Sequence, residues 1–183
     1  RMTSFITLPG IGSSGETHWQ THWEASDPCF TRFHPSDWDK PGLADWQDAL
    51  ERQIERSPSP PVLVAHSFAC LLVAHAAERV TGRVKGAFLV AVPDPASAAF
   101  PAAAASFANP PRRPLPFPAL IVASANDPYA APAYVKARAG EWHAGCVEIG
   151  PCGHINGASG LGIWEKGRML LAAFCAGLGL PSV

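Results

Sequence analysis

Six short apolar runs alternate with helix-like segments along most of this chain. The apolar runs are residues 5–8, 29–33, 62–65, 86–92, 119–124 and 146–149. Segments with helical character lie between and after them, at residues 16–24, 43–56, 68–80, 131–139 and 163–178. Strands that alternate with helices typically form a parallel sheet covered on both faces. The pattern therefore predicts an α/β fold with a six-stranded parallel sheet.

Length and composition favour a single domain over residues 1–183. The chain has 183 residues, of which 48% are hydrophobic and 16% charged, and this is enough apolar material for one core. The net charge is −1 and no basic run occurs, so we expect no nucleic-acid partner. No apolar stretch is long enough to cross a bilayer, so we also expect no membrane association.

Cysteine usage and the first residues bear on the cellular compartment. The five cysteines are an odd number and include no C-x-x-C pair. Residues 1–5 lead directly into the first apolar run, without the layout of a signal peptide. We therefore expect free thiols and a cytoplasmic protein.

A serine stands at the junction of the third apolar run and the helical segment after it. The junction reads Val64-Ala65-His66-Ser67-Phe68-Ala69. A serine at a sharp strand-to-helix turn is typical of a nucleophile elbow, which lifts the hydroxyl above the sheet. The usual pattern is G-x-S-x-G, and here alanine, the smallest replacement, takes both glycine positions. The alternative interpretation is an ordinary turn with a serine near a helix N-cap.

A nucleophilic serine needs a base within hydrogen-bonding distance, and three histidines follow Ser67 in the sequence. His75 lies about two turns into the next helical segment, so we expect a structural role for it. His143 ends a polar helical segment and is expected to face solvent. His154 lies in a glycine-containing loop between the last apolar run and the last helical segment, which is the position expected of the base.

The base in turn needs an acid that orients it. Asp127 follows the fifth apolar run, where the acid of such a triad is expected, although Asn-Asp-Pro is also ordinary turn chemistry. Asp94, which follows the fourth run, is the alternative acid. Residues 93–118, which are rich in proline and alanine, are interpreted either as a surface connection or as a cap over the site.

The loop after the first apolar run can complete the site. Gly10 and Gly12 in this loop allow the backbone to approach a substrate closely. We assign the oxyanion hole to the main-chain N–H groups of Ile11 and Phe68, with Gly12 as the alternative to Ile11. The expected substrate contacts are Gly10, Gly12, Ser13, His18 and Trp19.

Two other patterns of site residues carry less weight. The glycine loop lacks both G-x-G-x-x-G and a P-loop lysine, so we do not expect a nucleotide. His18 and His22 have the spacing of two helical metal ligands, but no third ligand is apparent in the sequence and no metal is predicted.

Several short segments occur together in one order over nearly the whole chain. They are Leu8-Pro9-Gly10, His18-Trp19-Gln20 with Trp23-Glu24, Trp38-Asp39-Lys40-Pro41, Ala65-His66-Ser67, Ser124-x-Asn126-Asp127-Pro128-Tyr129, and Gly153-His154-Ile155-Asn156 with Ser159-Gly160-Leu161-Gly162. In these segments the chain resembles the small α/β-hydrolase family that includes retinoblastoma-binding protein 9 and many bacterial serine hydrolases. The resemblance implies a compact α/β-hydrolase fold with strand order 2-1-3-4-5-6. It also implies a Ser67–Asp127–His154 triad and no cofactor.

From the residues and the resemblance together we expect a serine hydrolase. Its substrate would be a small ester, thioester or amide, cleaved through an acyl-enzyme. The chain departs from many relatives at Phe68-Ala69, so Phe68 would narrow the pocket or form an aromatic wall. A protein-binding module on the same scaffold, with little or no turnover, is the alternative. A carbon–carbon lyase or an acyltransferase with the same triad is a third possibility.

Overall fold

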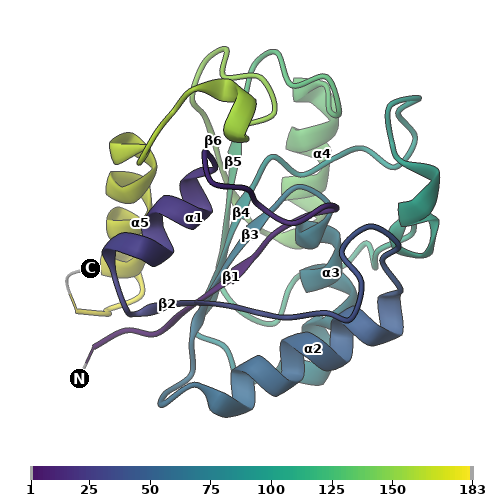
Figure 1. The fold of residues 1–183 in the computed structure, drawn as a ribbon. Coiled ribbons are helices and arrows are strands. Elements are labelled where there is room, and N and C mark those ends of the chain that lie inside the picture. The colour runs from purple at the N-terminus through teal and green to yellow at the C-terminus, as the bar shows by residue number, and fades with distance from the viewer. Residues whose placement is uncertain (1, 182–183) are drawn as a thin grey trace.

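The computed structural model describes residues 2–181 and is built around a six-stranded, all-parallel sheet (Figure 1). The strands are β1 (Phe5–Leu8), β2 (Phe30–Arg32), β3 (Val62–His66), β4 (Gly86–Val90), β5 (Ala119–Ala123) and β6 (Gly145–Glu148). Their order in the sheet is β2-β1-β3-β4-β5-β6, which confirms the predicted order. The direction of strand addition reverses between β1 and β3, and ligands of open α/β sheets bind beyond the carboxyl ends of the strands at such a point.

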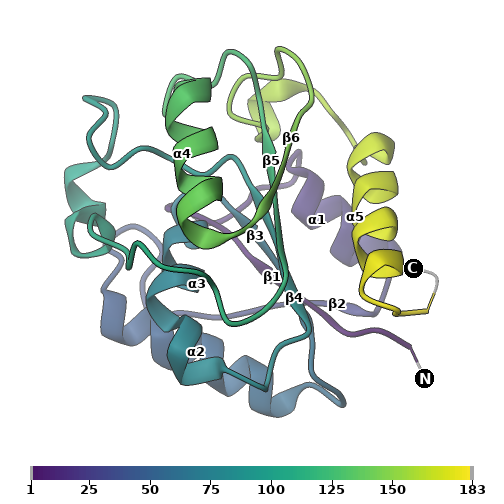
Figure 2. The same cartoon turned by 180° about the vertical axis from the view of Figure 1, so that it is seen from behind.

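Helices cover both faces of the sheet, as predicted (Figures 1 and 2). One face carries α1 (Trp19–Ser26) and α5 (Glu165–Gly177), and the other carries α2 (Leu43–Arg56), α3 (Ala69–Ala76) and α4 (Pro132–Trp142). The short 3₁₀ helices are η1 (Ala77–Val80), η2 (Ala102–Phe107) and η3 (Gly157–Ser159). No helix within residues 2–181 has both the length and the apolar character that crossing a membrane requires.

The alternation of strand side chains creates one core on each face of the sheet. In β3, Leu63 and Ala65 pack with the helices α2, α3 and α4, whereas Val62 and Val64 pack with α1 and α5. All four side chains are fully buried. Burying a valine or leucine side chain stabilises the fold by roughly 1.5–3 kcal/mol, so the central strands hold the site's loops on a firm base.

Several predicted boundaries were wrong by a few residues because of local backbone conformation. Strand β4 ends at Val90, before the predicted residue 92, because Ala91 adopts a left-handed conformation with φ 58°. Helix α5 begins at Glu165 because Trp164 before it has φ 48°. Helix α1 begins only at Trp19 because His18 caps it. The predicted helix over 68–80 is divided into α3 and η1.

Candidate active site

Ser67 occupies a strained turn between β3 and α3. Its φ is 59°, in the left-handed region that residues other than glycine rarely adopt. The turn is fixed because the N–H of Ser67 donates to the carbonyl of Val90 at 2.9 Å, while its own carbonyl accepts from Cys70 at 2.9 Å. Ala65 and Ala69, which take the two usual glycine positions, are fully buried.

His154 lies between Ser67 and Asp127 and contacts both. Its Nε2 is 2.8 Å from Ser67 Oγ, and its Nδ1 is 3.0 Å from each carboxylate oxygen of Asp127. Nδ1 therefore carries the proton that the carboxylate accepts, which leaves Nε2 of the neutral ring free to accept from the serine hydroxyl. The side chains are largely shielded from solvent, with 10% of His154 and 3% of Asp127 exposed.

The other candidates for base and acid lie in different surroundings. Asp94 and Asp127 each close their own turn by accepting a hydrogen bond at 2.9 Å, from the N–H of Ala96 and of Tyr129, and Asp127 also contacts His154. His75 is half-buried, with Nε2 3.0 Å from the carbonyl of Phe107. His143 is exposed and ends α4 in a left-handed conformation. The structure thus joins the three residues that the sequence assigned to the triad.

The loop after β1 reaches the nucleophile through Gly10. A Cβ atom added to Gly10 would lie 3.1 Å from Ser67 Cβ and 3.3 Å from the carbonyl oxygen of His66, so glycine permits this approach. The N–H of Ser13 donates to Gly10 O at 3.1 Å, and Gly12 has φ 76°, which together make a tight turn.

The main-chain N–H groups near Ser67 differ in what they bind. The N–H of Gly12 donates to the carbonyl of Trp38 at 2.9 Å, so the alternative oxyanion donor is already engaged. Within residues 2–181, the N–H groups of Ile11 and Phe68 donate to no protein group. Phe68 also lies at the start of α3, where the helix dipole favours negative charge.

The expected substrate contacts lie in different places. Gly10 contacts the elbow, and Gly12 is exposed. Ser13 Oγ accepts a hydrogen bond from Arg32 Nη1 at 3.1 Å. His18 and Trp19 are 5% and 1% exposed and lie in the interior, beneath the loop that carries His154. They therefore support the site from behind in this structure.

His18 is a buried, neutral imidazole. Its Nδ1 accepts from the main-chain N–H of Gln20 at 3.1 Å, and its Nε2 is buried without a partner within residues 2–181. Burial, with a smaller contribution from the Arg32 guanidinium, lowers the pKa of His18 to about 3. Within the same described range, no three histidine, cysteine or acidic side chains are grouped to hold a metal ion.

Two supporting residues had not been singled out by sequence reasoning. Arg32 donates to Ser13 Oγ and to the carbonyl of Ser14, and it pairs with Glu24 at 2.9 Å. These contacts hold the loop after β1 in place. Gln20 donates to the carbonyls of Leu8 and Val64 at 3.3 and 3.1 Å, joining the end of β1 to the middle of β3. The signals in the sequence were the place of Gln20 in one of the family segments and of Arg32 as a charged residue in the second apolar run.

Phe68 and the connection over residues 93–118 pack together in the interior. The Phe68 ring is 2% exposed and lies 5.0 Å from the Trp46 ring and 4.9 Å from the Phe107 ring. Its side chain therefore faces the core, and its main chain faces Ser67. Because η2 contributes Phe107 to this core, the connection is anchored beside the elbow.

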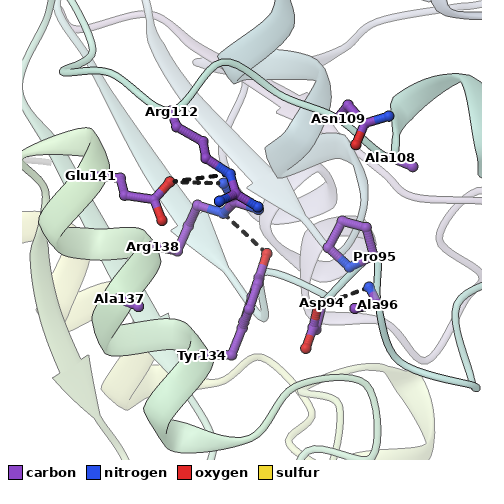
Figure 3. A pocket seen from close by; sticks show the side chains of 10 residues that line it. All are labelled: Asp94, Pro95, Ala96, Ala108, Asn109, Arg112, Tyr134, Ala137, Arg138 and Glu141. Atoms are coloured by element: carbon purple, nitrogen blue, oxygen red, sulfur yellow. Dashed lines mark hydrogen bonds and ion pairs between the residues drawn. The ribbon is translucent and has the colours of Figure 1, made fainter.

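A separate pocket of about 320 Å³ lies between this connection and α4 (Figure 3). Its lining includes Asp94, Arg112 and Tyr134 together with the buried guanidinium of Arg138. Arg138 donates to Tyr134 at 3.1 Å and pairs with Glu141 at 3.2 Å, which ties the turns of α4 together at the pocket wall. None of Ser67, Asp127 and His154 lines this pocket.

The sheet order and the serine at the β3–α3 elbow define an α/β-hydrolase. A family model described as serine hydrolase matches residues 5–173, and the chain belongs to this family. Its resemblance to retinoblastoma-binding protein 9 within that family stays a prediction.

Solved structures of similar fold agree with this class. A YdeN-like hydrolase from Pectobacterium atrosepticum is 30% identical, with a TM-score of 0.87 over 98% of this chain and 94% of that one. The ydeN gene product of B. subtilis is 18% identical, with a TM-score of 0.75 over 96% and 100%. A monoacylglycerol lipase from Paleococcus ferrophilus is 12% identical, with a TM-score of 0.71 over 96% of each chain. No curated protein matches in sequence.

Proposed function

We propose that this serine hydrolase cleaves a small ester, thioester or amide through a Ser67–His154–Asp127 triad. The observation that carries the proposal is the hydrogen-bonded line from the Asp127 carboxylate through both nitrogens of His154 to the Ser67 hydroxyl. Membership of the serine hydrolase family supports the same chemistry. Activated esters are less demanding substrates than amides, so carboxylesterase activity is the first expectation.

The three residues of the proposed triad divide the reaction among them. Ser67 Oγ attacks the carbonyl carbon while its proton passes to His154 Nε2, and Asp127 stabilises the imidazolium that forms. The N–H groups of Ile11 and Phe68 bind the developing oxyanion. The proton on His154 then goes to the leaving group, which leaves an acyl-enzyme on Ser67. Water activated by His154 releases the acid product and restores the hydroxyl.

Fluorophosphonate labelling followed by intact-mass measurement tests the proposal. Ser67 Oγ would form a bond to phosphorus, fluoride would leave, and the hydroxyl proton would be taken up by His154. We expect one adduct on the wild-type protein and none on Ser67→Ala. We also expect Ser67→Ala to lose p-nitrophenyl acetate turnover by about a thousandfold or more.

The outcomes separate the alternatives. If the wild-type protein gives no adduct with probes of several sizes, the proposal fails, and the protein-binding module becomes the better interpretation. If Ser67→Ala keeps full esterase turnover, the mechanism is wrong. If an adduct forms but the products are not those of hydrolysis, product analysis identifies an acyltransferase or a carbon–carbon lyase.

A further inference from the structure

The loop that carries His154 includes three residues in the left-handed backbone region. Gly150, Gly153 and Ile155 have φ values of 84°, 58° and 50°. The left-handed region suits the two glycines but is unfavourable for a β-branched residue such as Ile155. A loop of this kind keeps one conformation only when its surroundings fix it. The position of the His154 ring therefore depends on what binds the loop's main chain.

Two buried side chains bind consecutive carbonyl groups of this loop. His66 Nε2 lies 2.9 Å from the carbonyl oxygen of His154, and Trp19 Nε1 donates to the carbonyl oxygen of Ile155 at 2.8 Å. A carbonyl oxygen only accepts, so the bond to His154 requires a proton on His66 Nε2. Both donors are nearly fully buried, with 5% of His66 and 1% of Trp19 exposed. They fix the two residues on which the direction of the base depends.

Two polar side chains at the end of β5 hold the N–H groups just before His154. The hydroxyl oxygen of Ser124 accepts from the N–H of Cys152 at 2.9 Å. The side-chain oxygen of Asn126 accepts from the N–H of Gly153 at 2.8 Å. Loop residues before the base are therefore held from the β5 side, and the base itself is held from the α1 and β3 side.

His66 differs from the other anchors because it directly precedes Ser67. One strand end thus places the nucleophile and also holds the main chain of the base. Burial lowers the pKa of His66 well below its ordinary value, and the nearby His18 and His154 act in the same direction. The ring therefore stays neutral, with a single N–H to donate. His18 packs edge-on against it at 4.6 Å between ring centroids, which limits its rotation.

We propose that His66 is a positioning residue, whose Nε2–H holds the carbonyl of His154 so that the base meets Ser67 and Asp127 together. This inference rests on the proposed function, because it assigns a purpose to the His154 loop in that reaction. Trp19 has the same purpose one residue further along the loop. His66, Ser124 and Asn126, which lie near Ser67 or Asp127 in the sequence, thus all bind the main chain of the His154 loop.

The test compares His66→Leu with His66→Gln, and uses His75→Leu as a matched control. Leucine removes the donor at similar size, whereas glutamine keeps an N–H donor of similar reach. His75 makes the same kind of bond, from Nε2 to the carbonyl of Phe107 at 3.0 Å, but that carbonyl is outside the His154 loop. For each protein, kcat and KM are measured with p-nitrophenyl acetate, together with the rate of fluorophosphonate labelling and the Tm.

We expect His66→Leu to lower kcat by about 100-fold, since misplacing a catalytic group by 1 Å has an effect of this order. KM should change by no more than about twofold, because uniform binding of the substrate is untouched. His66→Gln should recover most of the kcat and of the labelling rate. His75→Leu should lower the Tm as His66→Leu does, but keep the wild-type kcat.

Wild-type kcat in a folded His66→Leu protein would overturn the inference, and so would equal losses of kcat in His66→Leu, His66→Gln and His75→Leu. Should His66→Leu not fold, Trp19→Phe removes the neighbouring bond to Ile155 and keeps an aromatic ring. That variant should lose about tenfold in kcat, and an unchanged kcat would equally overturn the inference. Failure of the wild-type protein to label would instead refute the proposed function, so the two failures are distinguishable.

Discussion

Gly10 and Ser67 approach each other so closely that no side chain fits between them. The position of a Cβ on Gly10 would be 3.1 Å from Ser67 Cβ and 3.5 Å from the Phe68 ring. The ring cannot retreat, because it is packed against Trp46 and Phe107. A side chain at residue 10 must therefore displace either the loop after β1 or Ser67. Gly10, which has no side chain, therefore sets the distance between the loop after β1 and Ser67.

We predict that Gly10→Ala lowers the rate of fluorophosphonate labelling by about tenfold to 100-fold, because displacement of reacting groups by a fraction of an ångström to 1 Å costs up to this amount. Gly15→Ala is the matched control in the same loop, since a Cβ there meets nothing within 4 Å. Intact-mass measurement over time gives both rates. Equal rates in the two variants would show that Gly10 does not control the nucleophile.

At the scale of elements, the packing of α5 depends on one glycine beneath a tryptophan. A Cβ on Gly167 would overlap the indole ring of Trp164. That ring lies 5.0 Å from the Trp19 ring and 5.8 Å from the Trp23 ring, so it joins α5 to α1. Helix α1 in turn supports the His154 loop through Trp19, and the two helices on this face act as one support.

Gly167→Ala should therefore lower the free energy of unfolding by about 1–3 kcal/mol, the usual cost of overpacking a filled interior. Gly177→Ala, at the exposed end of the same helix, meets nothing within 4 Å and should leave stability unchanged or raise it by about 0.5–1 kcal/mol. Urea unfolding of both variants measures the difference. A Gly167→Ala protein as stable as Gly177→Ala would contradict this account of the packing.

The strands and helices also show which parts of the fold and of the candidate site the sequence could predict. The parallel sheet and its two helical layers could be predicted because alternating apolar runs leave few arrangements that bury them all, whereas the strand order was implied by the family resemblance. Ser67, Asp127 and His154 could be singled out because each follows a strand, in the chain order that is usual for α/β-hydrolases. Trp19 was expected in the pocket because it follows the oxyanion loop. It is buried because its N–H finds Ile155, 136 residues away, and single-sequence patterns do not report such a partner.

At the scale of the whole molecule, buried neutral histidines make stability depend on pH. Burial lowers the pKa of His18, His66 and His75, and that of His18 falls to about 3. The unfolded chain binds a proton at each site near pH 6.5, whereas the native protein does not, so the unfolded state gains protons first as the pH falls. The stabilising contribution of each site is complete above pH 6.5 and declines below it.

For His18 alone, the free energy of unfolding should fall by about 2 kcal/mol between pH 7 and pH 5, at about 1.4 kcal/mol for each pH unit below 6.5. His18→Gln removes this titration and should show a correspondingly smaller fall. His34→Gln, which replaces an exposed histidine, is the matched control. Urea unfolding at pH 7 and pH 5 gives the three differences. The same pH dependence in the wild type and His18→Gln would refute a buried neutral His18.

The scattered origin of the anchors on the His154 loop has a consequence for how this protein is made. Ser67 and its proposed base are 87 residues apart in the sequence, and the anchors on the loop come from α1, β3 and the end of β5. Contacts of such long range form late, because the intervening chain must close first. If the proposed triad is correct, a chain in which the β3–α3 elbow has formed and the His154 loop has not would carry an unactivated Ser67. A fluorophosphonate would then label only the molecules in which the elbow and the His154 loop are both in place.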